Sequence, residues 1–320
     1  MLVLNYTTRK EYETLDAYDG TSQVFVLCEQ SDVPALCATF NLDETTAIPR
    51  ASIDESVHFT AHKNYDYASL IYAYASSGSV ITQEINVYIS HKFFILAIPQ
   101  NASGTTKEIE TQILEYAKSL MQNEHDTEEC ITGHFNQMLF IALNALIAYY
   151  STTLEQLEDT MHSLIEQVTQ DTKDSNLQTA QSLRKALYYY KKILRSYSYL
   201  GLQILCNEND VIQGEKLHLF RSADTRFRNL YNFAENVYEL NTELLNAYDG
   251  KTAQRTNNIV NRLTAITFIF APLGLMADIF GMNFAVMPGM QYPWAYPLAL
   301  ASMLCIGIVL YNIMKRQKWF

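Results

Sequence analysis

The sequence has 320 residues, of which 48% are hydrophobic and only 18% are charged, and its formal net charge at pH 7 is -11. Acids outnumber bases, 34 to 23, which excludes a nucleic-acid-binding protein that works through a basic patch. The charge is also unevenly distributed, because Asp278 is the only formally charged residue between Leu263 and Met314. Such a stretch excludes a purely soluble enzyme and predicts an acidic soluble part joined to a membrane part.

The cysteines and the N-terminus indicate a cytoplasmic location for most of the chain. Cys28, Cys37, Cys130, Cys206 and Cys305 are scattered without a Cys-x-x-Cys pair. This pattern is typical of reduced thiols in a cytosolic protein. The first residues form no basic segment followed by an apolar run, and they include Glu11 and Glu13, so we expect neither a secretory signal nor an organelle transit peptide.

Residues 1–125 mix strand-like and helical patterns. Runs rich in Val, Ile, Tyr and Phe predict strands at Gln23–Cys28, Tyr67–Ala75, Glu84–Ser90 and Phe93–Ile98. The polar break at Ser90–Lys92 suits a hairpin. Apolar residues at helical spacing predict a closing helix over Thr105–Glu124. We therefore expect an α/β cytoplasmic domain over these residues.

After Asn136 the strand-like runs stop, and residues 126–210 predict a helical hairpin. Its helices are expected over Met138–Val168 and Leu177–Leu205, with the turn at Gln170–Asn176. The first helix carries the acids Glu155, Glu158, Asp159 and Glu166, and the second carries the bases Arg184, Lys185, Lys191, Lys192 and Arg195. We expect these oppositely charged sides to face each other.

A very long helix follows the hairpin. From Lys216 no proline appears until Pro272, which predicts one helix over Lys216–Phe280, about 100 Å long at ~1.5 Å per residue. A helix of this length cannot stand alone in water. We therefore expect its cytoplasmic part, within residues 211–262, to be the stalk of an oligomer.

Two apolar segments predict membrane spans, at residues 263–280 and 294–314. Residues 281–293 form a loop without charge, and residues 315–320 form a basic tail. Basic residues precede the first span and follow the second, so the positive-inside rule predicts that both termini are cytoplasmic in a multi-pass protein of the cell (inner) membrane. Two spans per chain cannot enclose a polar path, so transport would need several copies.

A motif after the first span resembles a known family. The motif residues are Gly281-Met282-Asn283 followed by Phe284, then Met287-Pro288, Trp294 and Tyr296-Pro297. Together with the basic tail KRQKWF, they resemble the CorA family of divalent-cation channels, which has the same layout of α/β domain, hairpin, stalk and two C-terminal spans. The alternative is a two-span anchor whose loop contains a Gly-Asn turn.

The resemblance implies a funnel-shaped homopentamer whose first span lines a pore for Mg²⁺, with Co²⁺ or Ni²⁺ as further cargo. It also implies a selectivity filter made of Gly281, Met282 and Asn283, with Asn283 the first to meet the ion. The residue type fits this role, because Mg²⁺ keeps several of its water ligands and five amide carbonyls can accept hydrogen bonds from those waters. Partners would be the lipid bilayer, divalent cations and further copies of the chain.

Helical spacing counted back from Asn283 predicts the pore wall. The expected residues are Asp278, Gly274, Ala271, Thr267, Leu263 (or Thr264), Val260 and Asn257. Val260 and Leu263 are candidates for a hydrophobic gate that closes by dewetting. The alternative for each residue is packing against a neighbouring helix.

Asp278 and Asn283 are the predicted metal-binding residues of the path. An acid within a span usually lines water, so we expect an Asp278 ring to attract cations. The uncharged loop at residues 281–293 is not expected to attract cations, since Ala285 and Gly289 occupy positions where much of the family has acids. The alternative places Asp278 near the membrane interface.

The resemblance also implies closure by intracellular Mg²⁺. The family often has an acid after a Phe-Arg pair in the stalk, but Ser222 follows Phe220-Arg221 here, so Asp224 is the nearest candidate. His58 and His62 are spaced for a metal only if they share a helix face, whereas the segment reads as a strand.

Two other functions stay open. One is a proton-coupled Zn²⁺ transporter, as in the ZntB branch of the family, with Asp278 as the protonatable group. The other is a membrane-anchored scaffold or sensor that does not conduct. No nucleotide-binding glycine motif is present, and we expect no enzymatic activity.

Overall fold

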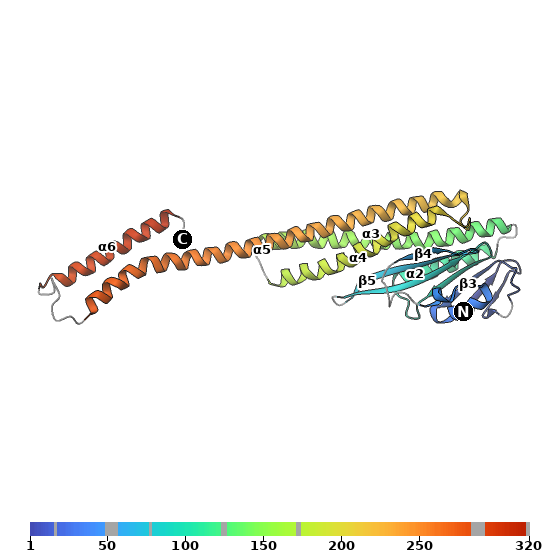
Figure 1. Cartoon of the computed structure of the whole chain (residues 1–320), viewed down its shortest axis with the longest axis horizontal. Coiled ribbons are helices and arrows are strands. Elements are labelled where there is room, and N and C mark those ends of the chain that lie inside the picture. The colour runs from blue at the N-terminus through green and yellow to red at the C-terminus, as the bar shows by residue number, and fades with distance from the viewer. Residues whose placement is uncertain are drawn as a thin grey trace. The chain divides into compact units, whose positions relative to one another are not determined.

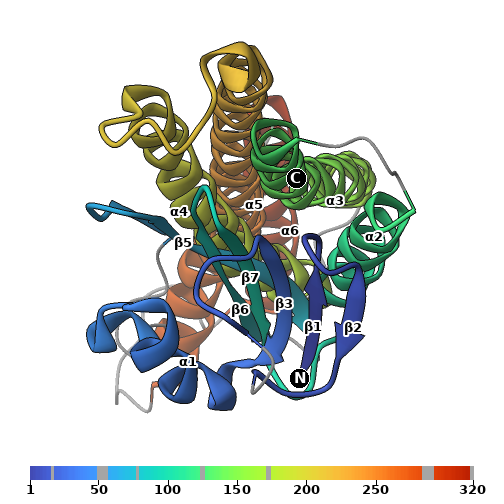
Figure 2. The same cartoon turned by 90° about the vertical axis from the view of Figure 1, so that its right-hand side faces the viewer.

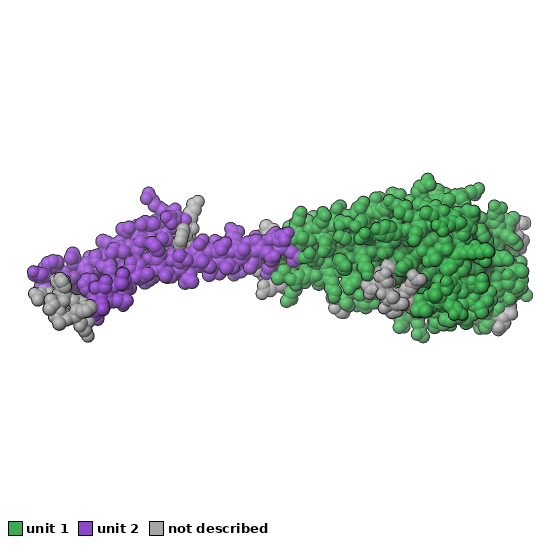
Figure 3. Space-filling model, viewed as in Figure 1, with its two compact units in different colours: residues 1–244 green, residues 245–320 purple. Residues whose placement is uncertain are grey.

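A computed structural model describes residues 1–15, 18–48, 57–76, 79–122, 127–170, 174–282 and 292–317. The chain forms two compact units, Met1–Leu244 and Leu245–Phe320, shown in green and purple in Figure 3. Helix α5 (Leu217–Gly281) begins in the first unit and ends in the second. The β-sheet of the described residues lies in the first unit.

The first unit contains a mixed β-sheet (Figure 1). Its strands are β1 (Leu2–Asn5), β2 (Lys10–Tyr12), β3 (Val24–Glu29), β4 (His58–Ala61), β5 (Asp66–Ser76), β6 (Ser79–Ile89) and β7 (Phe93–Ile98). Within the described residues the sheet has seven strands in the order β2-β1-β3-β7-β6-β5-β4. Neighbouring strands are antiparallel except β3 and β7, which are parallel.

Helices cover both faces of this sheet (Figure 2). The helices of the described residues are α1 (Val33–Phe40), α2 (Thr105–Leu120), α3 (Glu128–Gln170), α4 (Asp174–Cys206) and α5, together with α6 (Ala295–Arg316) in the second unit. Single 3₁₀ turns occupy Gln30–Asp32, Glu44–Ala47 and Gly214–Lys216. Helix α1 packs on one face, whereas α2, α3 and α4 contact β7, β6 and β5 from the other.

Alternation along the central strands gives the sheet two apolar faces. Val24 and Val26 belong to the core shared with α1. Phe25, between them, points to the opposite face and stacks on Phe94 with 6.0 Å between ring centroids. Phe94 in turn contacts Phe135 of α3. Because both faces are covered, these strands consist of nearly continuous apolar residues.

Most of the predicted elements are confirmed. The predicted strands correspond to β3, β5, β6 and β7, and the predicted helices correspond to α2, α3, α4 and α5. The polar break after β6 forms the expected hairpin, in which the Ser90 amide donates to the Phe93 carbonyl at 2.8 Å. The sequence does not predict β1, β2 or α1, because such short segments carry too little periodicity. Helix α3 also begins at Glu128 rather than at Met138.

Tyrosine hydroxyls take the place of a neighbouring strand along the outer half of β5. Strand β4 pairs with β5 only at Asp66–Ser69. Beyond it, the Tyr197 hydroxyl of α4 donates to the Ile71 carbonyl at 2.8 Å and accepts from the Ile71 amide at 2.9 Å. Tyr150 of α3 donates to the same carbonyl at 2.9 Å and accepts from the Ala73 amide at 3.2 Å. Both hydroxyls are buried, so they satisfy backbone groups that water does not reach.

We expect Tyr197→Phe to destabilise the full chain by about 1–3 kcal/mol, because a buried amide and carbonyl lose this partner. Thermal unfolding of the purified protein in detergent would measure the shift. Tyr188→Phe is the matched control, since Tyr188 is 55% exposed on the same helix. Equal unfolding temperatures for the two variants would contradict this role for the Tyr197 hydroxyl.

A buried carboxylate, Asp66, joins the start of β5 to the loop after α4. Its side chain is 1% exposed, and its Oδ1 accepts a hydrogen bond of 2.6 Å from Asn209 Nδ2. The same nitrogen donates to the His62 carbonyl at 2.8 Å. Burial, with a smaller effect from Glu208, raises the pKa of Asp66 to about 6, although the Asn209 hydrogen bond opposes the rise.

This pKa predicts a pH dependence of stability. A carboxyl group with a higher pKa in the folded state binds its proton more tightly when folded, so its contribution favours folding at low pH and is lost as the pH rises from about 4 to about 6. Asp66→Asn keeps a neutral acceptor for Asn209. We expect it to raise the unfolding temperature relative to the original chain at pH 7.5, with no gain at pH 4. A gain that is equal at both pH values would refute the assignment.

The second unit contains the C-terminal part of α5 together with α6. Among the described residues, α3, α5 and α6 are long and apolar enough to cross a membrane. The apolar window of α3 is 61% buried because α3 packs on the sheet, whereas the windows of α5 and α6 are each only 6% buried. Apolar surface exposed on this scale is typical of helices that meet lipid or another subunit.

Candidate functional site

The residues predicted to line a pore are exposed along α5. They are Asn257, Val260, Leu263, Thr267, Ala271, Gly274 and Asp278. Leu263 is 64% exposed and Val260 is 52% exposed. A single chain leaves both candidate gate residues open, so a gate at this position needs further copies of the chain.

Two threonines on this part of α5 bond to their own helix. The Thr264 hydroxyl donates to the Val260 carbonyl at 2.8 Å, and the Thr267 hydroxyl donates to the Leu263 carbonyl at 3.0 Å. This local bonding satisfies the hydroxyl protons without a partner helix. The oxygen lone pairs stay available to accept hydrogen bonds from water.

The position of α6 separates two sides of α5 within the second unit. A groove of about 370 Å³ lies between the two helices, and Ala277 and Phe280 line it on the α5 side. Leu273 of α5 also packs close to Gly307 of α6, since a Cβ added to Gly307 would lie 3.7 Å from the Leu273 side chain. An α-helix turns by about 100° per residue. Around the axis of α5, Asp278 therefore lies well over ~90° from the middle of the face that contacts α6. The predicted pore residues Gly274, Ala271 and Thr267 share its side.

The Gly-Met-Asn motif follows directly on the end of α5. Gly281 is the last helical residue, and the Met282 amide donates to the Ile279 carbonyl at 3.4 Å. The described residues do not include Asn283, Phe284, Ala285, Met287, Pro288 and Gly289. The filter geometry and the Asn283 ring therefore stay predictions.

Within the first unit, α5 divides its surface into two stripes. The buried stripe is mainly apolar, with Asp224 and Asn241 as its buried polar residues, and its apolar members include Phe220, Phe227, Leu230, Ala234, Val237 and Leu244. An exposed stripe at alternating three- and four-residue spacing carries Ser222, Thr225, Asn229, Asn232, Asn236, Glu239 and Glu243. We call this second set the polar stripe. Its spacing leads through Asn246, Gly250 and Ala253 to Asn257, the first of the predicted pore residues. Sequence analysis misses the polar stripe, because small polar residues give no hydrophobic period.

Asp224, the nearest candidate for a regulatory ligand, lies on the buried side of α5. It is 6% exposed, and its Oδ2 accepts a hydrogen bond of 3.0 Å from Arg228 Nε. Its Oδ1 has no hydrogen-bond partner. A Cβ on Gly201 of α4 would lie 2.5 Å from this Oδ1 and 2.8 Å from the Asp224 Cβ. The carboxylate therefore occupies space that only a glycine on α4 leaves free.

We expect Gly201→Ala to destabilise the first unit by about 1–3 kcal/mol, because the added methyl group overlaps a buried side chain. Thermal unfolding of the full chain would measure the change. Gly250→Ala is the matched helical control, since a Cβ at Gly250 meets nothing within 4 Å and should be neutral or stabilising. The packing argument is wrong if both variants unfold at the same temperature.

Two of the bases of α4, Arg184 and Lys191, contact α5 rather than the acids of α3, which corrects the expected pairing of charges for these two residues. Lys191 Nζ lies 2.9 Å from Glu235 Oε1. Lys191 and Arg184 also lie over the ring of Tyr238, at 4.8 and 5.6 Å from its centroid. Helices α3 and α4 contact each other, as the predicted hairpin requires.

The two histidines spaced for a metal ion do not form a site. Strand β4 begins at His58 and ends at Ala61, so the pair does not share a helix. The His62 ring stacks on Tyr65 at 4.4 Å between centroids. In the described residues, no group of three or more His, Cys, Asp or Glu side chains is arranged to hold a metal ion.

Comparisons with known proteins agree on one family. The family model "CorA-like Mg2+ transporter protein" matches residues 25–316. The cobalt/magnesium transport protein CorA of Thermotoga maritima is 27% identical over 182 residues, which span 57% of this chain and about half, 52%, of that protein.

Solved structures share the fold. The complete CorA magnesium transporter of Methanocaldococcus jannaschii has a TM-score of 0.78 at 17% identity, covering 97% of this chain and 95% of that one. The ZntB cytoplasmic domain of Vibrio parahaemolyticus has a TM-score of 0.60 at 12% identity, covering 79% of this chain and 98% of that one. At these identities the likeness shows the fold alone.

Proposed function

This chain belongs to the CorA-like Mg²⁺ transporter protein family, and we propose that five copies of it form a channel that admits Mg²⁺ to the cytoplasm. Co²⁺ and Ni²⁺ are further cargo. Each copy crosses the cell (inner) membrane at residues 263–280 and 294–314, with residues 281–293 outside and both termini in the cytoplasm. The tail at residues 315–320 supplies the positive charge that holds this orientation.

The observation that carries the proposal is the division of the α5 surface. In the first unit the apolar side of α5 is buried, and the polar stripe remains exposed. A helix pair in water would place apolar residues on its contact stripe. Small amides, hydroxyls and carboxylates suit a wall that faces water. Copies of α5 around a central axis would present this stripe, and the exposed side of Val260 to Asp278, to one continuous path.

Each ring along this path has a distinct task. Asn283 holds the hydrated ion at the outer mouth through its amide oxygens, together with the backbone of Gly281 and Met282. Asp278, next inward, attracts cations into an otherwise uncharged span. Val260 and Leu263 form the narrow apolar section that stops ions when it loses water, and Asn257 follows on the cytoplasmic side.

The membrane potential is sufficient to drive the ion inward. A divalent cation that enters a negative-inside cell gains about 4.6 kcal/mol for each 100 mV, which is twice the figure for one charge. Closure by intracellular Mg²⁺ follows from the charge of the cytoplasmic part. Each chain carries a formal charge of -11, so several copies repel one another unless cations bind between them. Asp224 would contribute only if the contact between α4 and α5 opened.

Flux into liposomes that contain the purified protein tests the channel. Under a negative-inside potential we expect Mg²⁺ influx that grows with voltage. Asp278→Asn should reduce the influx by about tenfold, because the cation loses the attraction of a ring of carboxylates. Asn283→Ala should abolish selective influx.

Asp249→Asn is the matched control, because Asp249 is an exposed acid of the same helix before the apolar segment. It should leave the flux nearly unchanged. Influx through Asp278→Asn equal to that of the original chain would remove the proposed role of the Asp278 ring. The absence of any divalent flux would favour the non-conducting scaffold.

A proton-coupled Zn²⁺ transporter is the second candidate. The fold is similar to that of the ZntB cytoplasmic domain, and Asp278, the one acid within an apolar segment, would be the group that carries the proton. Zn²⁺ uptake that follows an inward proton gradient without a membrane potential, and that Asp278→Asn uncouples from pH, would select this mechanism over the channel.

A further inference from the structure

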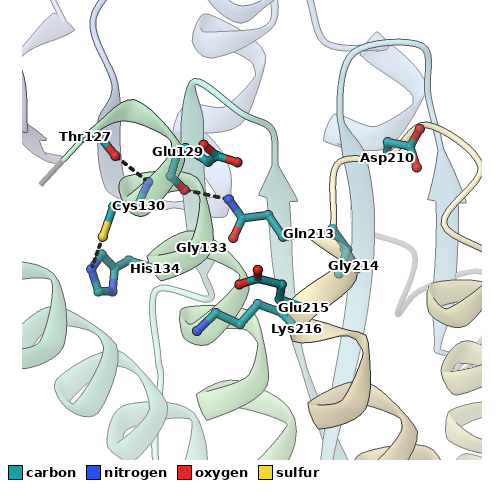
Figure 4. Close-up of a pocket in the computed structure, with 11 residues that line it drawn as sticks. Thr127, Glu129, Cys130, Gly133, His134, Asp210, Gln213, Gly214, Glu215 and Lys216 are labelled. Carbon is teal, nitrogen blue, oxygen red and sulfur yellow. Dashed lines mark hydrogen bonds between the residues drawn. The ribbon is translucent and has the colours of Figure 1, made fainter.

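The helical hairpin separates its charges by helix. Helix α3 contains no Lys or Arg, and α4 contains no Asp or Glu after its first residue, Asp174. At the start of α3 another part of the chain supplies a base, because Lys216 lines the same cavity as Glu129 and Glu215 (Figure 4). The acids beyond Tyr150 have no base on their own helix. One helix of the hairpin is therefore acidic and the other basic.

The acids in the second half of α3 lie on the side of the helix that faces away from the core. They are exposed and recur with a histidine at alternating four- and three-residue spacing, so they share one face. Met161, which lies among them in the sequence, is fully buried on the opposite side. We call this set the acidic face of α3, and its members are Glu155, Asp159, His162 and Glu166.

The outer side of α4 is basic and aromatic. Tyr188 and Tyr199 are 55% and 54% exposed, and Leu202 is 46% exposed. The guanidinium carbon of Arg195 lies 5.9 Å from the centroid of the Tyr199 ring, which holds a charge and a ring on one surface. We call the exposed set at three- and four-residue spacing the basic face of α4, and its members are Lys185, Tyr188, Lys192, Arg195, Tyr199 and Leu202.

The basic face of α4 has the composition of a protein-binding surface. Tyrosine and arginine are enriched at protein interfaces, where the rings bury apolar area and the guanidinium group pairs with carboxylates. The other two bases of α4 already have partners on α5, since Lys191 pairs with Glu235 and Arg184 lies over the ring of Tyr238. The basic face therefore suits an acidic partner, and the acidic face of α3 in a second copy of the chain is such a partner.

The two faces lie on different sides of the first unit. Seen along the helices, α4 and α3 flank α5, with α4 to its left and α3 to its right (Figure 2). Each face is opposite to the buried side of its own helix. The two faces of one chain therefore do not meet, whereas the acidic face of one copy can meet the basic face of the next. A contact between two different faces repeats around an axis and can close into a ring.

Tyrosine rings fix how the two antiparallel helices align. The ring of Tyr150 on α3 lies 6.0 Å from that of Tyr190 and 6.1 Å from that of Tyr197 on α4, measured between centroids. Tyr150 is therefore level with the stretch of α4 between these two tyrosines. From this level both helices continue toward the turn of the hairpin, α3 with increasing and α4 with decreasing residue numbers.

This alignment places acids and bases at equal heights. Five residues of helix span ~7.5 Å at ~1.5 Å per residue, so Glu155 lies ~7.5 Å beyond Tyr150 and is level with Tyr188. Asp159, one turn further, is level with Lys185. In the proposed channel the copies of α5 surround one axis, and rotation about an axis along α5 preserves these levels. The acidic face of one copy then meets the basic face of the next in register.

We propose that the acidic face of α3 in one copy docks on the basic face of α4 in the next copy, with Asp159 paired to Lys185 and the Tyr188 hydroxyl donating to Glu155. The contact rests on the proposed channel, because it needs several copies around one axis. It also adds to that proposal, because it names surfaces that attract neighbouring cytoplasmic parts although each chain carries a net charge of -11.

Cross-linking of the full-length protein in detergent tests the contact. Asp159→Cys and Lys185→Cys are introduced together, after the exposed cysteines Cys130, Cys206 and Cys305 have been replaced by serine. A short bismaleimide should then join each copy to the next, and a denaturing gel should show a ladder of bands that ends at five chains. Each single variant should run as one chain, because the contact joins two different faces.

Lys185→Cys combined with Glu44→Cys is the matched control, since Glu44 is exposed in the turn after α1, on the other face of the sheet. This pair should give no ladder. A ladder from Lys185→Cys alone would overturn the proposal, because it would require two equal faces in contact. A pentamer in native mass spectrometry that gives no ladder with Asp159→Cys and Lys185→Cys would overturn the contact and leave the proposed channel standing. A single chain in native mass spectrometry would overturn both.

Charge reversal tests the pairing itself. Lys185→Glu should lower the temperature at which the oligomer dissociates in native mass spectrometry, because the Asp159 carboxylate then faces another carboxylate. Asp159→Lys should lower it in the same way, since two bases then meet. The double variant restores opposite charges, so it should recover most of the loss. No recovery in the double variant would overturn the pairing of Asp159 with Lys185.

Discussion

Helix α5 must satisfy different surroundings on its two sides, and much of the structure depends on how it does so. In the first unit, Phe220, Phe227 and Leu230 are buried. The exposed side carries amides, hydroxyls and carboxylates, which no apolar partner helix could bury without cost. Burial therefore fixes the rotation of α5 about its own axis in the first unit.

The second unit inverts the relation between burial and polarity. Its helices expose large apolar side chains such as Phe270 and Leu304, at 66% and 65%. This surface would be unfavourable in water, whereas a lipid bilayer accommodates it. Against this background Asp278 is the exception. It lies on the side of α5 that faces away from α6, and in the proposed channel this side would face water.

Buried polar groups also hold the first unit together. Tyr150 and Tyr197 bond to the free edge of β5, and Asn209 bonds to the carboxylate of Asp66. Each bond links an element of the sheet to the helical hairpin or to the loop after it. Movement of the hairpin relative to the sheet would leave several buried donors and acceptors unpaired. The sheet, α3 and α4 should therefore move together.

The sequence by itself determined the long elements and the membrane segments, because sustained apolar periodicity and the absence of charge report local burial directly. It also carried the Gly281 to Asn283 motif, and with it the family. Only the tertiary structure decided that Lys191 pairs with Glu235, that Asp224 is buried against Gly201, and that Cys130 and His134 adjoin Tyr116. The physical reason is that such contacts join residues from different elements. Their partners depend on the angle and rotation at which helices pack, and no local pattern encodes either.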